Sequence, residues 1–98
     1  MRETQQQATD RLALQIAEGL ALLPANLRRR LESAPEGFRH MLGNALFGVH
    51  HCQAESDYDQ GVHFGKTVGS VTTAYSLNVI DGKLFEDLMR ALPQVKAR

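Results

Sequence analysis

The sequence of 98 residues lacks several features that would place it in a familiar class. It has one cysteine, no tryptophan and only three prolines, and no apolar run is long enough to span a bilayer. A single cysteine excludes an intrachain disulfide and fits a reducing compartment. The amino-terminal segment does not have the shape of a signal peptide. We therefore expect a soluble cytoplasmic protein with no membrane association.

The chain also lacks an excess of charge of either sign. Eleven basic residues balance eleven acidic ones, which argues against a surface that attracts nucleic acid or membranes as a whole. With 43% hydrophobic and 22% charged residues, the composition is that of an ordinary globular domain. A chain of this length can bury one core. We expect a single domain over 1–98, with loose tails at 1–4 and 94–98.

Apolar residues recur at helical spacing in most of the chain. The first helix is expected to be capped by Thr4 and Gln7, which form a capping-box pattern, and to end at Pro24. Its apolar face comprises Ala8, Leu12, Ile16, Leu20 and Leu23. The pattern predicts an amphipathic helix with one face turned to the core.

Four further segments are also predicted to be helices. A short helix lies between Pro24 and Pro35, and a third spans about 37–55, with a second stripe beside its apolar one formed by His40, Asn44, Phe47 and His51. A fourth helix begins after a cap at Ser56 or Asp57, and a fifth begins at Asp81 and ends before Pro93. The predicted fold is all-α, with four to five helices in a compact orthogonal or bundle-like domain.

Residues 70–85 could instead form a β-hairpin. They are rich in β-branched side chains, and the Asp81-Gly82 pair is typical of a hairpin turn. The helical spacing of residues 84–92 favours two helices joined by a turn. Such a helix–turn–helix could bind DNA, but the charges exposed on the last helix sum to zero, whereas phosphate binding favours a basic helix.

Three glycines stand four residues apart in the fourth helix: Gly61, Gly65 and Gly69. Each weakens a helix by about 1 kcal/mol relative to alanine, so packing should offset the loss. A strip of small residues lets a second backbone approach closely. We expect an internal crossing of the third and fourth helices there; the alternative is a seam between two copies of the chain.

A cluster of potential metal ligands occupies residues 50–63. His51 and Glu55 are four residues apart, as are Asp59 and His63, so each pair could share a helix face and chelate an ion. Without an HExxH or CxxC motif, solvated polar residues explain the pattern better, and we expect no metal and no cofactor. Cys52 continues the apolar stripe of the third helix, which favours a buried structural role over that of a nucleophile.

Three consecutive arginines, Arg28, Arg29 and Arg30, are the candidate partner-binding residues. Arginines bind phosphates and carboxylates through a forked geometry. On a helix, however, three neighbours spread over about 200°, and a solvated helix end is the simpler explanation for them.

No catalytic or nucleotide-binding motif occurs. We therefore expect a non-enzymatic protein, monomeric or homodimeric, that binds another protein as an accessory or inhibitory factor, as phage- and plasmid-encoded inhibitors often do. The alternatives are a nucleic-acid-associated regulator that uses Arg28–Arg30 and, third, a metal-binding protein that uses His51, Glu55, Asp59 and His63.

Overall fold

The computed structural model describes residues 3–51 and 57–94, with side chains described outside 57–60 and 94. Its elements are α1 (Gln5–Leu20), α2 (Ala25–Leu31), α3 (Glu36–His51), α4 (Asp57–Ser76), α5 (Gly82–Ala91) and the 3-10 turn η1 (Leu92–Gln94). The described residues contain no strand, so the expected all-α fold is confirmed and the hairpin across Asp81-Gly82 is excluded.

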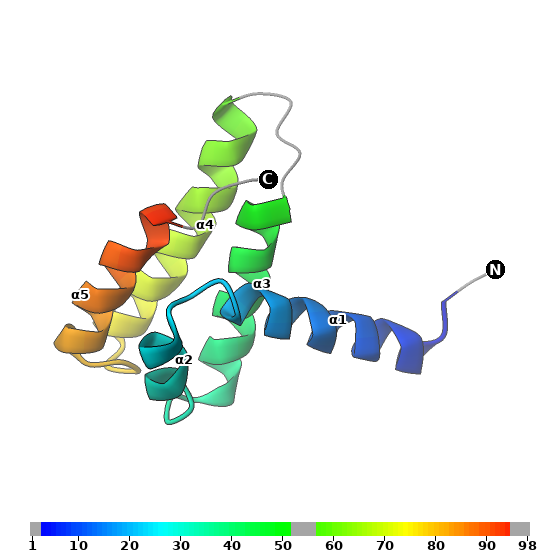
Figure 1. Ribbon diagram of the computed structural model, residues 1–98, viewed down its shortest axis with the longest axis horizontal. Helices are drawn as coiled ribbons and strands as arrows, with labels where there is room; N and C mark the ends of the chain where they lie inside the picture. Colours follow the sequence, from blue (N-terminus) through cyan, green and yellow to red (C-terminus); the bar gives the residue numbers. More distant parts are fainter. Residues whose placement is uncertain (1–2, 52–56, 95–98) are drawn as a thin grey trace.

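The helices are arranged around the antiparallel pair α3 and α4 (Figure 1). α5 lies antiparallel to α4 on the side away from α3, and the short α2 closes one end against α5. α1 crosses α3 near the middle of that helix and projects away from the other four. The fold is therefore a four-helix body with an arm, measuring 46 × 32 × 24 Å along its principal axes.

The core lies between α2, α3, α4 and α5. Its fully buried side chains come from all four helices and from η1: Leu31, Leu42, Leu46, Thr67, Val71, Leu88 and Leu92. Burying one leucine side chain contributes about 1.5–3 kcal/mol. Thr67 is the one buried polar side chain among the described residues, and its hydroxyl donates to the carbonyl oxygen of His63 at 3.2 Å. The apolar stripes of the sequence thus meet in a single core.

Two predicted helix caps are present. The Thr4 hydroxyl accepts from the Gln7 amide at 3.1 Å, and the Gln7 side chain accepts from the Thr4 amide at 2.8 Å, which completes the capping box. At the start of α5, the Asp81 carboxylate accepts from the Leu84 amide at 2.8 Å. Both caps satisfy amide groups that have no partner within the helix.

The turn between α4 and α5 follows a pattern that the sequence analysis did not identify. Asn78 has a φ of 59°, in the left-handed region. Its amide donates to the Tyr75 carbonyl at 3.1 Å, and the Val79 amide donates to the Ala74 carbonyl at 2.8 Å. These two bonds form a Schellman motif, in which asparagine takes the place most often held by glycine. Tyr75 then stacks on Phe85 of α5, with ring centroids 4.5 Å apart.

The closest helix crossing joins α1 and α3 through Gly19 and Gly43. A Cβ atom built on Gly19 would overlap the carbonyl oxygen of Gly43, and one built on Gly43 would lie 2.6 Å from the carbonyl oxygen of Ile16. Only glycine at both positions lets the two backbones approach this closely. The crossing fixes the direction in which α1 leaves the body.

The predicted internal crossing at Gly61, Gly65 and Gly69 was wrong. All three glycines are exposed, and in the described part of the chain a Cβ atom at any of them would meet no neighbouring element within 4 Å. α4 instead faces the core with Thr67, Val71 and Ala74, on the opposite side of the helix. The error has a simple reason: helical spacing shows that residues share a face, and does not say which face is buried. The seam between two copies stays a prediction.

Candidate functional site

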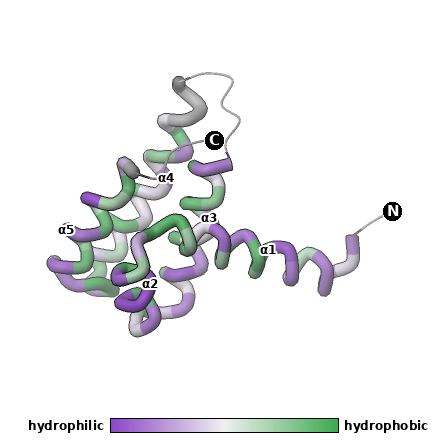
Figure 2. Tube along the Cα trace, in the orientation of Figure 1, coloured by the Kyte–Doolittle hydropathy of each residue, from purple (hydrophilic) through white to green (hydrophobic). Residues whose placement is uncertain are grey.

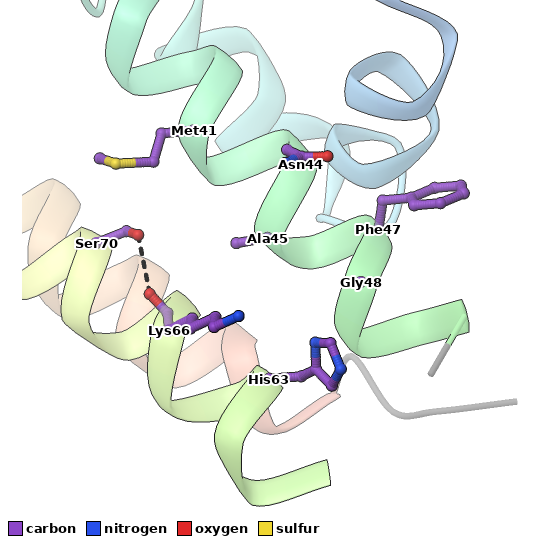
Figure 3. Close-up of a pocket in the computed structure, with 8 residues that line it drawn as sticks. All are labelled: Met41, Asn44, Ala45, Phe47, Gly48, His63, Lys66 and Ser70. Carbon is purple, nitrogen blue, oxygen red and sulfur yellow. Dashed lines mark hydrogen bonds between the residues drawn. The ribbon is translucent and has the colours of Figure 1, made fainter. Parts of the chain in front are cut away.

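A hollow with a volume of about 500 Å³ lies between α3 and α4 (Figure 3). α3 contributes Met41, Asn44, Ala45, Phe47 and Gly48, and α4 contributes His63, Lys66 and Ser70. We call this hollow the α3–α4 groove. It is partly open to solvent, so a ligand could reach it from the surface.

The wall formed by α3 is mostly apolar. Met41 is 46% exposed, whereas the other long apolar side chains of α3 are largely covered. In Figure 3 its side chain extends toward the α4 side, while the Phe47 ring points away from α4. That ring stacks on His51, with centroids 4.2 Å apart. Met41 and Ala45 therefore form the apolar surface that a ligand would contact, and Phe47 forms its outer edge.

Gly48 shapes the deep end of this groove. A Cβ atom at Gly48 would lie 3.4 Å from Nδ1 of His63, about van der Waals contact. The His63 ring thus lies beside the backbone of α3 at Gly48, as Figure 3 shows. This places an imidazole at the end of the apolar wall.

The wall formed by α4 supplies polar groups. Lys66 is exposed, and the Ser70 hydroxyl donates to the Lys66 carbonyl oxygen at 2.8 Å. Together with His63 and the amide of Asn44, Lys66 provides donors along the groove, and over the residues whose side chains are described, 3–51 and 61–93, no acidic one lines it. An ammonium group beside apolar surface favours a ligand that carries a carboxylate or another anion next to an apolar group.

The three candidate arginines do not form a common surface. Arg30 donates from Nη1 to Oδ2 of Asp87 at 2.6 Å, which ties α2 to α5. Arg28 donates to the carbonyl oxygen of Ala21, just beyond the end of α1, at 3.3 Å. Arg29 is exposed and has no ion pair among the described residues. Two of the three guanidinium groups therefore hold the fold together, and one remains for a partner.

The candidate metal ligands lie largely outside the described residues. Glu55 and Cys52 are not among them, nor is the side chain of Asp59. His51 stacks on Phe47, and His63 lines the α3–α4 groove. Over the described ranges, no group of three or more histidine, cysteine, aspartate or glutamate side chains is placed to hold an ion. The metal hypothesis therefore stays untested at its central positions.

The sequence analysis found part of the groove and missed its chemistry. Asn44 and Phe47 belong to the second stripe that it noted on the third helix. Neither Met41 nor Lys66 was identified as a site residue. A lysine among glycines and threonines on a long helix was the available signal, but its distance from α3 depends on how the two helices pack.

Comparisons with protein-family models, curated proteins and solved structures find no significant match. Among the described residues, no helix combines the length and apolar character needed to cross a bilayer.

Proposed function

We propose that this chain is a non-enzymatic cytoplasmic protein that binds another protein, and that the α3–α4 groove accepts a partner segment with an acidic side chain beside an apolar one. The observation that carries the proposal is the composition of the groove: an apolar wall with Met41 faces a wall with Lys66, and none of the lining side chains that the structure describes is acidic. Neutral net charge over the whole chain makes this local arrangement selective, because there is no general attraction for anions.

Two further features support a binding role. The groove of about 500 Å³ is partly open to solvent, so a segment of a macromolecule could reach it. Its walls belong to two long helices whose buried faces, with Leu42 and Val71, anchor them in the core. A partner would therefore meet a preformed surface, and little ordering entropy would oppose binding.

The test is affinity capture from the native host with three variants. Lys66→Glu reverses the charge inside the groove, and Met41→Asp removes the apolar contact. Arg29→Glu is the matched control, because it makes the same change of charge at an exposed position on α2, outside the groove. A specific partner should be captured by the wild type and by Arg29→Glu, and should be lost with both groove variants. Circular dichroism must show that all three variants are folded.

Two outcomes would count against this function. Capture that persists in Lys66→Glu and Met41→Asp but fails in Arg29→Glu would move the binding site to α2. Capture of RNA or DNA in place of a protein would favour the alternative, a nucleic-acid-associated regulator. Arg28 and Arg30 already bond within the fold, so that alternative depends mainly on Arg29.

A further inference from the structure

A second hollow, with a volume of about 530 Å³, lies where the connection between α1 and α2 meets α5. It is lined by residues 22–24 of that connection, Asn26 and Leu27 of α2, and Asp87, Arg90 and Ala91 of α5. In Figure 2 the connection is hydrophobic, and α5 alternates between hydrophobic and hydrophilic positions. We call this the α2–α5 hollow. In the described part of the chain it shares no lining residue with the α3–α4 groove.

The inner wall of the α2–α5 hollow is apolar and held in place by the core. Leu27 is 3% exposed and Ala91 is 8% exposed, and both belong to the main core. Leu22 is partly buried against the same core. The ion pair between Arg30 and Asp87 also ties α2 to α5 beside the hollow. The hollow is therefore preformed, and its volume falls within the ~300–1,000 Å³ typical of small-molecule sites.

Arg90 supplies a positive charge that the fold does not use. Its side chain is exposed, and it forms no ion pair with any residue that the structure describes. Glu86 lies one turn earlier on α5, and even this carboxylate does not pair with it. A guanidinium group presents its N–H donors in a planar fork, which matches the two oxygens of a carboxylate.

Among the described side chains, Asp87 is the one acidic group that lines the hollow, and it is already paired. Its Oδ2 accepts from Nη1 of Arg30 at 2.6 Å, and Nζ of Lys83 lies 3.4 Å from its Oδ1. With Arg90, three cations stand against this carboxylate, which leaves two positive charges, or one when the exposed Glu86 is counted. The charges around the hollow therefore favour an anion.

We propose that the α2–α5 hollow binds a small aliphatic monocarboxylate, whose carboxylate bonds to Arg90 and whose chain lies over Leu22 and Leu27. One guanidinium group without a partner matches one negative charge. The carboxyl end of a protein chain shares this chemistry, but its last amide would lie over the apolar wall, where a polar group without a partner is costly. The free acid is therefore the better match. The inference does not depend on the function proposed for the α3–α4 groove.

The test is a titration of the full chain with hexanoate, followed through the backbone amide signals in two-dimensional NMR. Signals of residues that line the hollow should shift and saturate, while those of Met41 and Lys66 in the α3–α4 groove should stay in place. Acetate has the charge without the chain, and hexanol has the chain without the charge. Each should bind about tenfold or more weakly than hexanoate, because each loses one of the two contacts.

Two arginine variants separate a specific contact from a general effect of charge. Arg90→Gln should weaken hexanoate binding by about tenfold or more, because the charge-assisted hydrogen bonds are lost. Arg29→Gln is the matched control, since Arg29 is also exposed and without an ion pair among the described residues but does not line the hollow. It should bind like the wild type. Both positions are exposed, so both variants should fold, and the NMR spectrum verifies it.

Four results would overturn the inference. The first is a wild type whose hollow shows no saturable shift at millimolar hexanoate, or whose shifts are confined to the α3–α4 groove. The second is binding that survives Arg90→Gln or that falls equally in Arg29→Gln. The third is hexanol that binds as tightly as hexanoate, which would make the hollow a general apolar site. The fourth is tighter binding of N-acetylleucine, a model of a chain end, which would assign the hollow to a protein partner.

Discussion

Arg30 on α2 and Asp87 on α5 form the ion pair that joins two helices far apart in the chain. The distance between Nη1 and Oδ2 is 2.6 Å, and the two side chains are 35% and 21% exposed. Lys83, one turn before Asp87 on α5, lies 3.4 Å from the other carboxylate oxygen. The hydrogen bond from Arg30 lowers the pKa of Asp87 below its ordinary value of 3.8, against an opposing effect of desolvation, and Lys83 lowers it further. The ionised carboxylate is therefore the form that the fold prefers.

The first prediction concerns acid stability. Because the pKa of Asp87 is lower in the folded chain, its ionised form stabilises the fold fully above the ordinary value of 3.8, and this contribution is lost as the pH falls through the lowered pKa. Asp87→Asn should have a lower urea midpoint than the wild type near neutral pH, by a modest amount because the pair is partly exposed. The two midpoints should converge as the pH falls below 3.8 and through the lowered pKa of Asp87. A difference that is the same in neutral and acidic solution would show that Asp87 acts through packing and not through its charge.

The second prediction compares two helical glycines with opposite surroundings. Gly19→Ala places a methyl group against the backbone of α3 at Gly43 and should destabilise the protein by about 1–3 kcal/mol through overpacking. Gly65→Ala adds the same methyl group to an open surface and should stabilise α4 by up to about 1 kcal/mol. Urea denaturation of both variants measures the difference in sign.

Three results of the glycine comparison would contradict these expectations. If Gly19→Ala is neutral, the crossing of α1 and α3 is looser than the structure indicates. If Gly65→Ala destabilises a protein that remains monomeric, then α4 packs against another part of the same chain. If it destabilises a dimer and lowers its molar mass, the glycine face of α4 is a subunit seam.

Most of the fold could be predicted because apolar spacing and helix caps are local signals. The capping box of Thr4 and Gln7 and the cap at Asp81 appear in the structure as expected. The second, third and fifth helices begin and end close to the expected residues, with prolines at 24, 35 and 93 marking boundaries. Each of these signals involves residues within one turn of each other, so no knowledge of the tertiary arrangement is needed.

The rest of the fold and the groove depend on which helices pack against each other. A glycine in a helix can be buried or exposed, so the sequence could not show that Gly19 and Gly43 form the close crossing while Gly61, Gly65 and Gly69 face outward. The face of the first helix was expected to be covered along its length, yet α3 covers only its carboxyl end. The groove is likewise a product of packing. Met41 and Lys66 are 25 positions apart in the sequence, and they line the same hollow only because α3 and α4 pack together.

The third prediction tests binding of nucleic acid by the arginine cluster. Arg30 is paired with Asp87, and Arg28 bonds to the end of α1, so Arg29 is the cation free to contact a phosphate. We expect binding to duplex and single-stranded oligonucleotides to be weak at physiological salt, and Arg29→Glu to change it little. Fluorescence anisotropy across a salt series measures both. Tight binding that falls steeply with salt and is abolished by Arg29→Glu would instead support the nucleic-acid alternative.

The last prediction separates the structural and the binding faces of α3, using two adjacent residues. Leu42 is 0% exposed in the core, and Met41 is 46% exposed in the groove. Leu42→Ala leaves a cavity and should cost about 2–5 kcal/mol of stability. Met41→Ala should change stability by about 0.5 kcal/mol or less, as exposed substitutions usually do, while weakening capture of the partner. Urea denaturation measures the first effect, and affinity capture from the host measures the second. A large loss of stability in Met41→Ala would place that side chain in the core, and the apolar wall of the α3–α4 groove would then be packing surface that no partner needs to reach.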